Sequence, residues 1–158
     1  GVDPGFGLAF LKSQLASGQI ISEEGTIFIS VNNRDKPSIV EPARIFAGMG
    51  YTLVVTQGTG DYLERFGIET TRVNKVYEGR PNVIDMIKNK QIQLVINTSS
   101  GKLTVQDSSS LRQTTILYNI PYTTTVAGAR ALAMALRQRR AHEGITVGSL
   151  QEFYAPSV

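Results

Sequence analysis

The 158-residue sequence contains no cysteine, which excludes disulfide bonds, thiolate metal sites and cysteine nucleophiles. It has no run of about 18 apolar residues, the length that a membrane helix needs, and its first residues lack the layout of a signal peptide. His142 is the only histidine and lies in a polar segment, where we expect a solvated side chain rather than a catalytic base. These absences favour a cytoplasmic protein in which any acid–base chemistry would depend on carboxylates.

The chain has only a small excess of basic over acidic residues. The chain carries 16 basic and 13 acidic residues, a net charge of +3. Nucleic-acid binding needs basic side chains gathered on one surface, and the one dense cluster, Arg137, Arg139 and Arg140, ends an alanine-rich helical pattern. Cations are favoured there by the helix dipole. No nucleic-acid partner is therefore expected.

Length and composition predict one globular domain. Apolar residues make up 41% and charged residues 18% of the chain, as in domains that fold around their own core. The sequence starts Gly1-Val2-Asp3 without a methionine. We expect it to be part of a longer protein that carries the catalysis.

Short apolar runs alternate with helical patterns along the chain. Runs rich in β-branched residues predict strands at 26–31, 51–56, 68–73, 94–96 and 120–123. Helical spacing predicts helices at 5–17, 61–66, 83–89, 111–117 and 126–140, one that opens at Pro37, and a last turn at 150–154. Apolar strands between helices are typical of a parallel sheet covered on both faces. We predict a three-layer, doubly wound α/β fold with about five mostly parallel strands.

Polar segments follow the predicted strands. Residues 32–36 follow the first strand, 56–60 the second, 74–75 the third and 97–101 the fourth. Ligands of open α/β sheets bind in the crevice beyond the carboxyl ends of the strands. We therefore expect these four segments to converge on one binding site.

Residues 56–60 read Thr-Gln-Gly-Thr-Gly and are predicted to connect a strand to a helix. Two hydroxyls, and two glycines that let a ligand approach the backbone, favour a phosphate at the helix N-terminus. Lys36 and Lys75, after neighbouring strands, would supply positive charge. Threonine and glycine are also common turn and capping residues, so a structural role stays open. The glycine spacing fits neither a P-loop nor a dinucleotide fingerprint, and ATP hydrolysis by this chain is not expected.

No pair of carboxylates is singled out as catalytic, and no metal site is predicted. The candidates are Asp35, Glu41, Asp61, Glu78, Asp85 and Asp107. Asp107 is nearest to the segment after the fourth strand. It is expected either to cap a helix that begins near Ser108 or to contact a ligand.

Several motifs occur in an order that resembles a known family. They are TQGT at 56–59, NKVYEGRPN at 74–82, IKN at 87–89 and VINTSSG at 95–101. Together they are similar to the C-terminal allosteric domain of the carbamoyl phosphate synthetase large subunit, which has the methylglyoxal-synthase-like fold. The resemblance implies a leading helix within residues 1–20 that joins from a preceding synthetic domain. It also implies one regulatory domain over residues 21–158.

The resemblance implies an allosteric site and no catalysis or cofactor in this chain. In the family, the domain binds nucleotide monophosphates such as UMP, an inhibitor, and IMP, an activator in some bacterial members. The residues implied for the phosphate are Lys36, Thr56, Thr59, Lys75, Asn97 and Ser99, and those near the sugar and base are Ser30 and Asp107. The parent chain would be a ligase that uses ATP and Mg, with a glutamine amidotransferase small subunit as partner, in pyrimidine and arginine synthesis.

Two positions depart from the family pattern. Ser99 stands where the motif often has threonine, and it keeps the hydroxyl. In some bacterial members ornithine bridges this domain to its neighbour through a histidine–tyrosine pair and a threonine at the fifth strand. Here Pro121 supplies no imidazole, which leaves Tyr122 and Thr124 as the candidates for that contact.

Two other functions stay open. A methylglyoxal-synthase-like lyase acting on dihydroxyacetone phosphate would need a carboxylate base beside the phosphate segment. Residues 101–107 lack the glycine-rich run that leads to the catalytic aspartate of those enzymes, and the assisting histidines are missing. The third hypothesis is an interaction or oligomerisation module without a small ligand, in which Lys75 would be dispensable.

Overall fold

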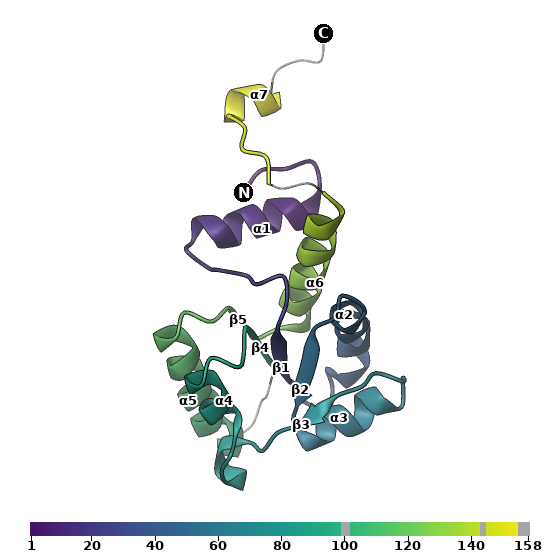
Figure 1. The fold of residues 1–158 in the computed structure, drawn as a ribbon, viewed down its shortest axis with the longest axis vertical. Helices are drawn as coiled ribbons and strands as arrows, with labels where there is room; N and C mark the ends of the chain where they lie inside the picture. Colours follow the sequence, from purple (N-terminus) through teal and green to yellow (C-terminus); the bar gives the residue numbers. More distant parts are fainter. Residues whose placement is uncertain (99–101, 143–144, 155–158) are drawn as a thin grey trace.

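The computed structural model describes residues 1–98, 102–142 and 145–154, with the backbone alone at 102–107 and at Tyr154. Its strands are β1 (Thr26–Ser30), β2 (Thr52–Val55), β3 (Thr71–Arg72), β4 (Leu94–Asn97) and β5 (Tyr122–Thr123). Its α-helices are α1 (Phe6–Ala16), α2 (Lys36–Gly48), α3 (Gln57–Glu64), α4 (Val83–Lys88), α5 (Lys102–Leu117), α6 (Val126–Ala141) and α7 (Leu150–Tyr154), and a 3-10 turn, η1, covers Val76–Glu78 (Figure 1).

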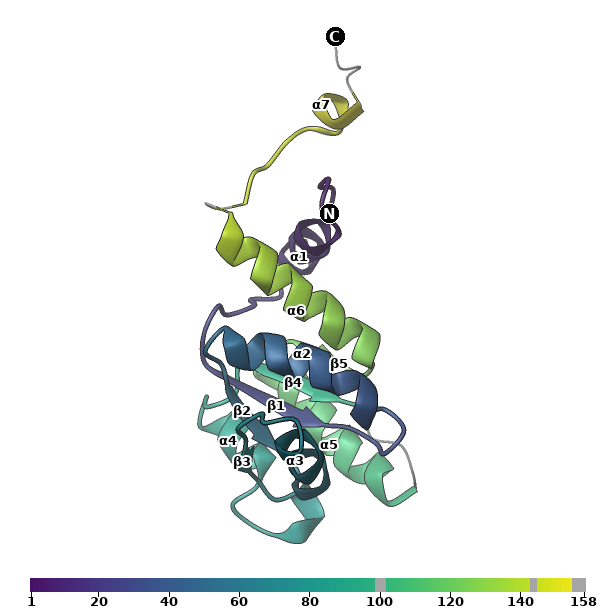
Figure 2. The same cartoon turned by 90° about the vertical axis from the view of Figure 1, so that its right-hand side faces the viewer.

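The strands of the described residues form one parallel sheet in the order β3-β2-β1-β4-β5. β1 is central: Phe28 lies opposite Val54 of β2 on one side and opposite Val95 of β4 on the other. Helices cover both faces of this sheet (Figure 2). The predicted doubly wound α/β fold is confirmed.

Different helices cover the two faces because side chains alternate along a strand. Ile27 and Ile29 belong to the larger core, together with apolar residues of α2, α3 and α6. Phe28 points the other way and belongs to a smaller core with residues of α4 and α5. Each β1 side chain from Ile27 to Ile29 is therefore buried, whichever face it lies on.

The leading helix α1 packs on the outer side of α6 (Figure 2). Leu11 is fully buried at this contact, whereas Phe6, which the helical spacing placed on the same face, is 61% exposed. The helix begins and ends within one residue of the predicted range. That it joins from another domain stays a prediction.

The chain leaves the neighbouring strands β1 and β4 toward opposite faces of the sheet, into α2 and α5 respectively (Figure 2). Such a divergence opens a crevice at the carboxyl ends of the two strands. Ser30 and Asn97, the last residues of β1 and β4, are paired in register at this point. The topology therefore provides a site where the polar segments were predicted to meet.

Two boundaries differ from the prediction around α3. The helix predicted at 61–66 begins at Gln57, so residues 57–60 form its first turn rather than a loop. Glycine and threonine have low helix propensity, and the pattern therefore hid this turn. The strand predicted at 68–73 is only Thr71–Arg72, because the Ile68 N–H donates to the Leu63 carbonyl (3.3 Å) and closes the end of α3.

A third boundary differs in α5, which begins at Lys102 instead of near Leu111. Asp107 therefore lies inside the helix, and the prediction that it caps a helix beginning near Ser108 is wrong. The serine- and threonine-rich sequence gave little helical signal. Tertiary packing stabilises this helix where its intrinsic helix propensity is low, since Leu111 is buried in the core that α4 and α5 share.

We expect Leu11→Ala to lower the free energy of unfolding by about 2–5 kcal/mol, the usual cost of truncating a buried leucine. Phe6→Ala on the same helix is the matched control and should cost less than about 1 kcal/mol, because that ring is mostly exposed. Urea unfolding of both variants measures the difference. Equal losses would show that α1 is not packed against α6 in solution.

Candidate functional site

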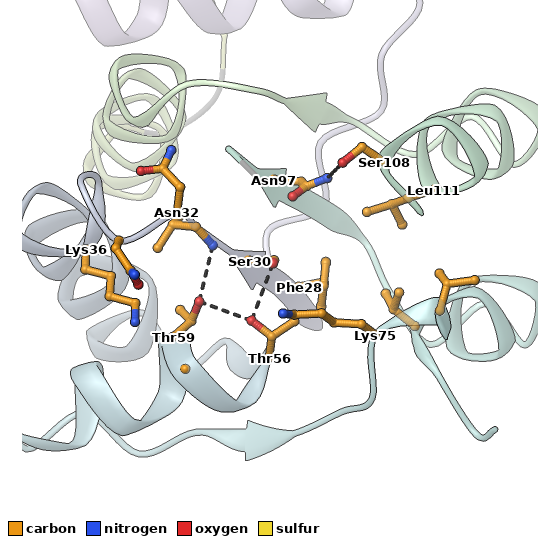
Figure 3. Close-up of a pocket in the computed structure, with 15 residues that line it drawn as sticks. Phe28, Ser30, Asn32, Lys36, Thr56, Thr59, Lys75, Asn97, Ser108 and Leu111 are labelled. Carbon is orange, nitrogen blue, oxygen red and sulfur yellow. Dashed lines mark hydrogen bonds between the residues drawn. The ribbon is translucent and has the colours of Figure 1, made fainter. Parts of the chain in front are cut away.

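A cavity of about 260 Å³ lies at the carboxyl ends of the central strands. Small-molecule sites measure roughly 300–1,000 Å³, so this one suits a single small ligand rather than a dinucleotide. The residues that line it are Phe28, Ser30, Val31, Asn32, Asn33, Lys36, Thr56, Gly58, Thr59, Lys75, Val76, Val83, Asn97, Ser108 and Leu111 (Figure 3). The four polar segments after the strands all contribute, and their predicted convergence is confirmed.

The first turn of α3 forms one wall. Thr56 is the N-cap residue, with extended backbone at φ −70° and ψ 155°, and its carbonyl accepts from the Thr59 and Gly60 N–H groups (3.1 and 3.0 Å). The earliest N–H groups of a helix have no carbonyl partner within it and carry the positive end of the helix dipole. Gly58, in this first turn, lines the cavity. The wall is therefore suited to an anion.

Hydroxyl groups at this wall are fixed by a buried network. The Val31 N–H donates to Thr59 Oγ1 (3.2 Å), which is 3.2 Å from Thr56 Oγ1. Thr56 Oγ1 donates in turn to Ser30 Oγ (3.4 Å), as the dashed lines of Figure 3 show. Because all three hydroxyl side chains are buried, their positions are set before any ligand arrives.

Two lysines flank the threonines. Figure 3 shows Lys36 beside Thr59 and Lys75 beside Thr56. Lys36 Nζ would lie 3.3 Å from a Cβ built on Gly58, so glycine leaves room for the ammonium group against the helix turn. Lys75 Nζ is 3.9 Å from Glu78 and 5.6 Å from the centre of the Tyr77 ring. Among the residues that the structure describes, Lys36 has no ion-pair partner.

The two glycines of this segment have different roles, which corrects the expectation that both face a ligand. Gly58 lines the cavity, but Gly60 does not. A Cβ on Gly60 would overlap the guanidinium group of Arg72 from β3. The second glycine therefore makes room for a side chain rather than for a ligand.

Amide groups hold together the ends of β1 and β4. Asn32 Nδ2 donates to the Thr98 carbonyl (2.8 Å) and to Asp35 Oδ2 (2.6 Å). Asn97 Nδ2 donates to Ser108 Oγ (3.3 Å) and to the Tyr122 hydroxyl (3.1 Å). These bonds link the neighbouring strand ends to each other and to α5.

The structure places most of the predicted site residues together. Six of them line the cavity: Ser30, Lys36, Thr56, Thr59, Lys75 and Asn97. Tyr122 lies behind Asn97, while Thr124 is exposed and does not line the cavity. Ser99 and the side chain of Asp107 fall outside the described residues. A contact of Tyr122 and Thr124 with ornithine stays a prediction.

The apolar part of the cavity was missed in the sequence. It consists of Phe28, Val31, Val76, Val83 and Leu111. Phe28 had a usable signal, since it lies two residues before Ser30 and must share its face of the strand. Leu111 had none, because the helix that carries it was predicted to begin there. Ser108 also lines the cavity without having been assigned to it, whereas Asn32 belongs to the segment 32–36 that was predicted to reach the site.

The NKVYEGRPN segment at 74–82 ends in a helix cap beside the cavity. Asn82 Oδ1 accepts from the Ile84 N–H (3.0 Å), and Asp85 Oδ2 accepts from the Asn82 N–H (3.0 Å). Hydrogen bonds from Arg80, and then from the Asn82 N–H, lower the pKa of Asp85 below its ordinary 3.8. The charged carboxylate therefore persists at neutral pH and keeps the start of α4, with Val83, in place.

Within the described ranges, no group of three or more histidine or acidic side chains is placed to hold a metal ion. No helix there is long and apolar enough to cross a membrane. What the cavity offers is hydroxyls, amides and ammonium groups, which suit recognition of an anion. The fold and site define a class: a doubly wound α/β domain with a cationic pocket at the point where the strand order reverses.

The family model of the MGS-like domain matches residues 38–124, and the chain belongs to this family. It is 44% identical over 158 residues to "Carbamoyl phosphate synthase large chain, C-terminal section" of Aquifex aeolicus (strain VF5), covering 98% of this chain and 29% of that one. It is 43% identical over 154 residues to "Carbamoyl phosphate synthase large chain" of Rhizobium meliloti (strain 1021), covering 98% and 13%. The chain thus spans less than a third of either relative.

A solved structure has the same fold at lower sequence similarity. The crystal structure of methylglyoxal synthase from Elizabethkingia anophelis NUHP1 superposes with a TM-score of 0.56 at 23% identity, covering 72% of this chain and 79% of that one. This likeness supports the fold assignment alone.

We expect Thr59→Val to destabilise the chain by about 1–3 kcal/mol, because the Val31 N–H would lose its buried acceptor. Amide exchange of Val31 should become faster by about tenfold or more in this variant. Thr59→Ser is the matched control, since it keeps the hydroxyl and should keep Val31 protected. Hydrogen exchange followed by NMR measures both, and equal protection of Val31 in the two variants would disprove the network.

Proposed function

We propose that this chain is an effector-binding, allosteric domain of a carbamoyl phosphate synthase large chain, and that its cavity binds a nucleoside monophosphate such as UMP or IMP. The observation that carries the proposal is the meeting of Lys36, Lys75 and the buried Thr56 and Thr59 hydroxyls at the first turn of α3. Helix N-termini of this kind bind phosphate groups. Asn97 and Ser99 would complete the phosphate pocket.

The opposite part of the cavity supports a nucleotide rather than phosphate alone. Phe28, Val83 and Leu111 belong to one apolar cluster and line the cavity. Figure 3 shows Leu111 beside Ser108, on the side where Asn97 lies. A ligand that fills the cavity needs an anionic end and a partly apolar end with hydrogen-bonding groups. A base joined through ribose to a phosphate has this form, with the sugar and base near Ser30 and Asp107.

Regulation would follow from different affinities of the effector for two states of the whole enzyme. The parent protein in this proposal is a cytoplasmic ligase that uses ATP and Mg and works with a glutamine amidotransferase subunit. The matches support the assignment to a large chain, since this chain corresponds to a smaller portion of proteins with that name. The chain itself would supply effector binding and no bond-making step.

The lyase hypothesis gains no specific support. The likeness to methylglyoxal synthase is a likeness of fold, and the side chain of Asp107, its only proposed base, lies outside the described residues. An interaction module without a ligand would not need Lys75, which is half-buried and lines a cavity together with hydroxyl groups.

Calorimetric titration of the chain with UMP, IMP and inorganic phosphate tests the proposal. We expect at least one nucleotide to bind, and Lys75→Ala to weaken it by about 1–3 kcal/mol, the usual loss for a charged hydrogen-bond partner. Lys88→Ala is the matched control, because it removes an exposed lysine that does not line the cavity.

Two results would contradict the proposal. One is the absence of binding by either nucleotide at millimolar concentration. The other is nucleotide binding that Lys75→Ala and Lys88→Ala weaken equally, because the cavity would then not be the site.

A further inference from the structure

Arg72, on the edge strand β3, contacts the helix turn that would bind phosphate, although it does not line the cavity. Its backbone lies opposite Val55, the residue before Thr56. Its guanidinium group occupies the space where a side chain on Gly60 would lie. Glycine inside a helix is destabilising relative to alanine. Gly60 nevertheless stands in α3, which indicates that the contact between this helix turn and the Arg72 guanidinium group has a role.

The guanidinium group is held by acidic residues of α3. Arg72 Nη2 is 3.2 Å from Asp61 Oδ1 and 2.8 Å from Glu64 Oε1, and Nη1 donates to Thr70 Oγ1. The two carboxylates are about half exposed. Exposed ion pairs contribute little to stability. The arrangement is better explained by its effect on the negative charge of Asp61 and Glu64, which Arg72 partly balances.

The negative charge of Asp61 lies close to the first turn of α3, where the anion would bind. Asp61 is four residues after Gln57, about 6 Å along the helix axis, and its Oδ1 accepts a hydrogen bond from Gln57 Nε2 (2.8 Å). Without Arg72, both carboxylates would repel a phosphate at this turn, and Asp61 more strongly, because its separation from Gln57 along the axis is less than the Debye length of about 8 Å at physiological salt. With it, the first turn of α3 keeps its positive potential.

We propose that Arg72 is a positioning residue for the anion site: its single positive charge offsets one of the two negative charges of Asp61 and Glu64 and holds both carboxylates against β3, and Gly60 is the residue that makes room for it. The inference rests on the proposed function, because it concerns phosphate binding in the same cavity. It adds a residue that neither touches the ligand nor lines the site.

The first experiment is titration of the chain with whichever of UMP and IMP binds, at about 0.02 M and about 0.5 M salt. We expect Arg72→Ala to weaken binding by about three- to tenfold at low salt and by less at high salt. Adding Asp61→Asn and Glu64→Gln to Arg72→Ala should restore the affinity to within about twofold of the parent chain. Arg130→Ala, which removes an exposed partner of Glu41 at 3.1 Å, is the matched control.

The second experiment needs no ligand and tests the role of Gly60. Gly60→Ala is made in the parent chain and in the Arg72→Ala chain, and urea unfolding gives the midpoint of each. We expect Gly60→Ala to raise the midpoint more in the Arg72→Ala background, because the added methyl then meets no guanidinium group. Equal shifts in the two backgrounds would show that the contact is absent.

The outcomes separate the two proposals. If neither nucleotide binds the parent chain, the proposed function fails together with this inference. If nucleotide binding depends on Lys75 while Arg72→Ala binds like the parent, or the triple variant fails to restore affinity, this inference alone is wrong. If Arg72→Ala loses the same factor in nucleotide affinity at both salt concentrations, this inference is also wrong, since salt must screen an effect of charge.

Discussion

The pairing of β1 with β4 is the constraint on which the site depends. The two strands are neighbours, yet their connections run to opposite faces of the sheet. The carboxyl ends of β1 and β4, at Ser30 and Asn97, are then not covered by a helix, and a polar crevice remains there. The hydrogen bond from Asn32 to the Thr98 carbonyl holds the two strand ends together. The residues that α2, α3 and α5 bring to the cavity are positioned relative to this pair.

Positive charge in the cavity is concentrated by geometry rather than by composition. The whole chain has a net charge of only +3, but the end of β1 and the end of β3 each bring one lysine to the turn that begins α3. Buried hydroxyls complete the wall and pay their desolvation cost through mutual hydrogen bonds. The acidic residues of α3, Asp61 and Glu64, are paired with Arg72, which does not line the cavity. The same helix therefore carries anionic side chains and still presents a cationic turn.

The sequence predicted the sheet and the alternation of elements from local patterns. Six of the residues that line the cavity were also predicted, from the polar segments that follow the strands and from the family resemblance, which alone pointed to Ser30. The sequence did not predict the extent of α3 and α5. The first turn of α3 is rich in glycine and threonine, and the middle of α5 is rich in serine; the helical state of such segments is decided by tertiary contacts such as the burial of Leu111. The role of Gly60 was hidden for a related reason: the residue that needs its space, Arg72, is twelve positions away and comes close only through strand pairing.

The central claim is that the cavity at the carboxyl ends of β1, β2 and β4 binds a nucleoside monophosphate. Backbone amide chemical shifts of the ¹⁵N-labelled chain, followed by NMR as UMP or IMP is added, test it most directly. The account predicts that the largest changes fall at residues 57–60, at Lys36 and at Lys75. Changes gathered instead around the groove between α1, α5 and β5, where Phe10, Ile116 and Tyr122 lie, would contradict it and place the ligand elsewhere.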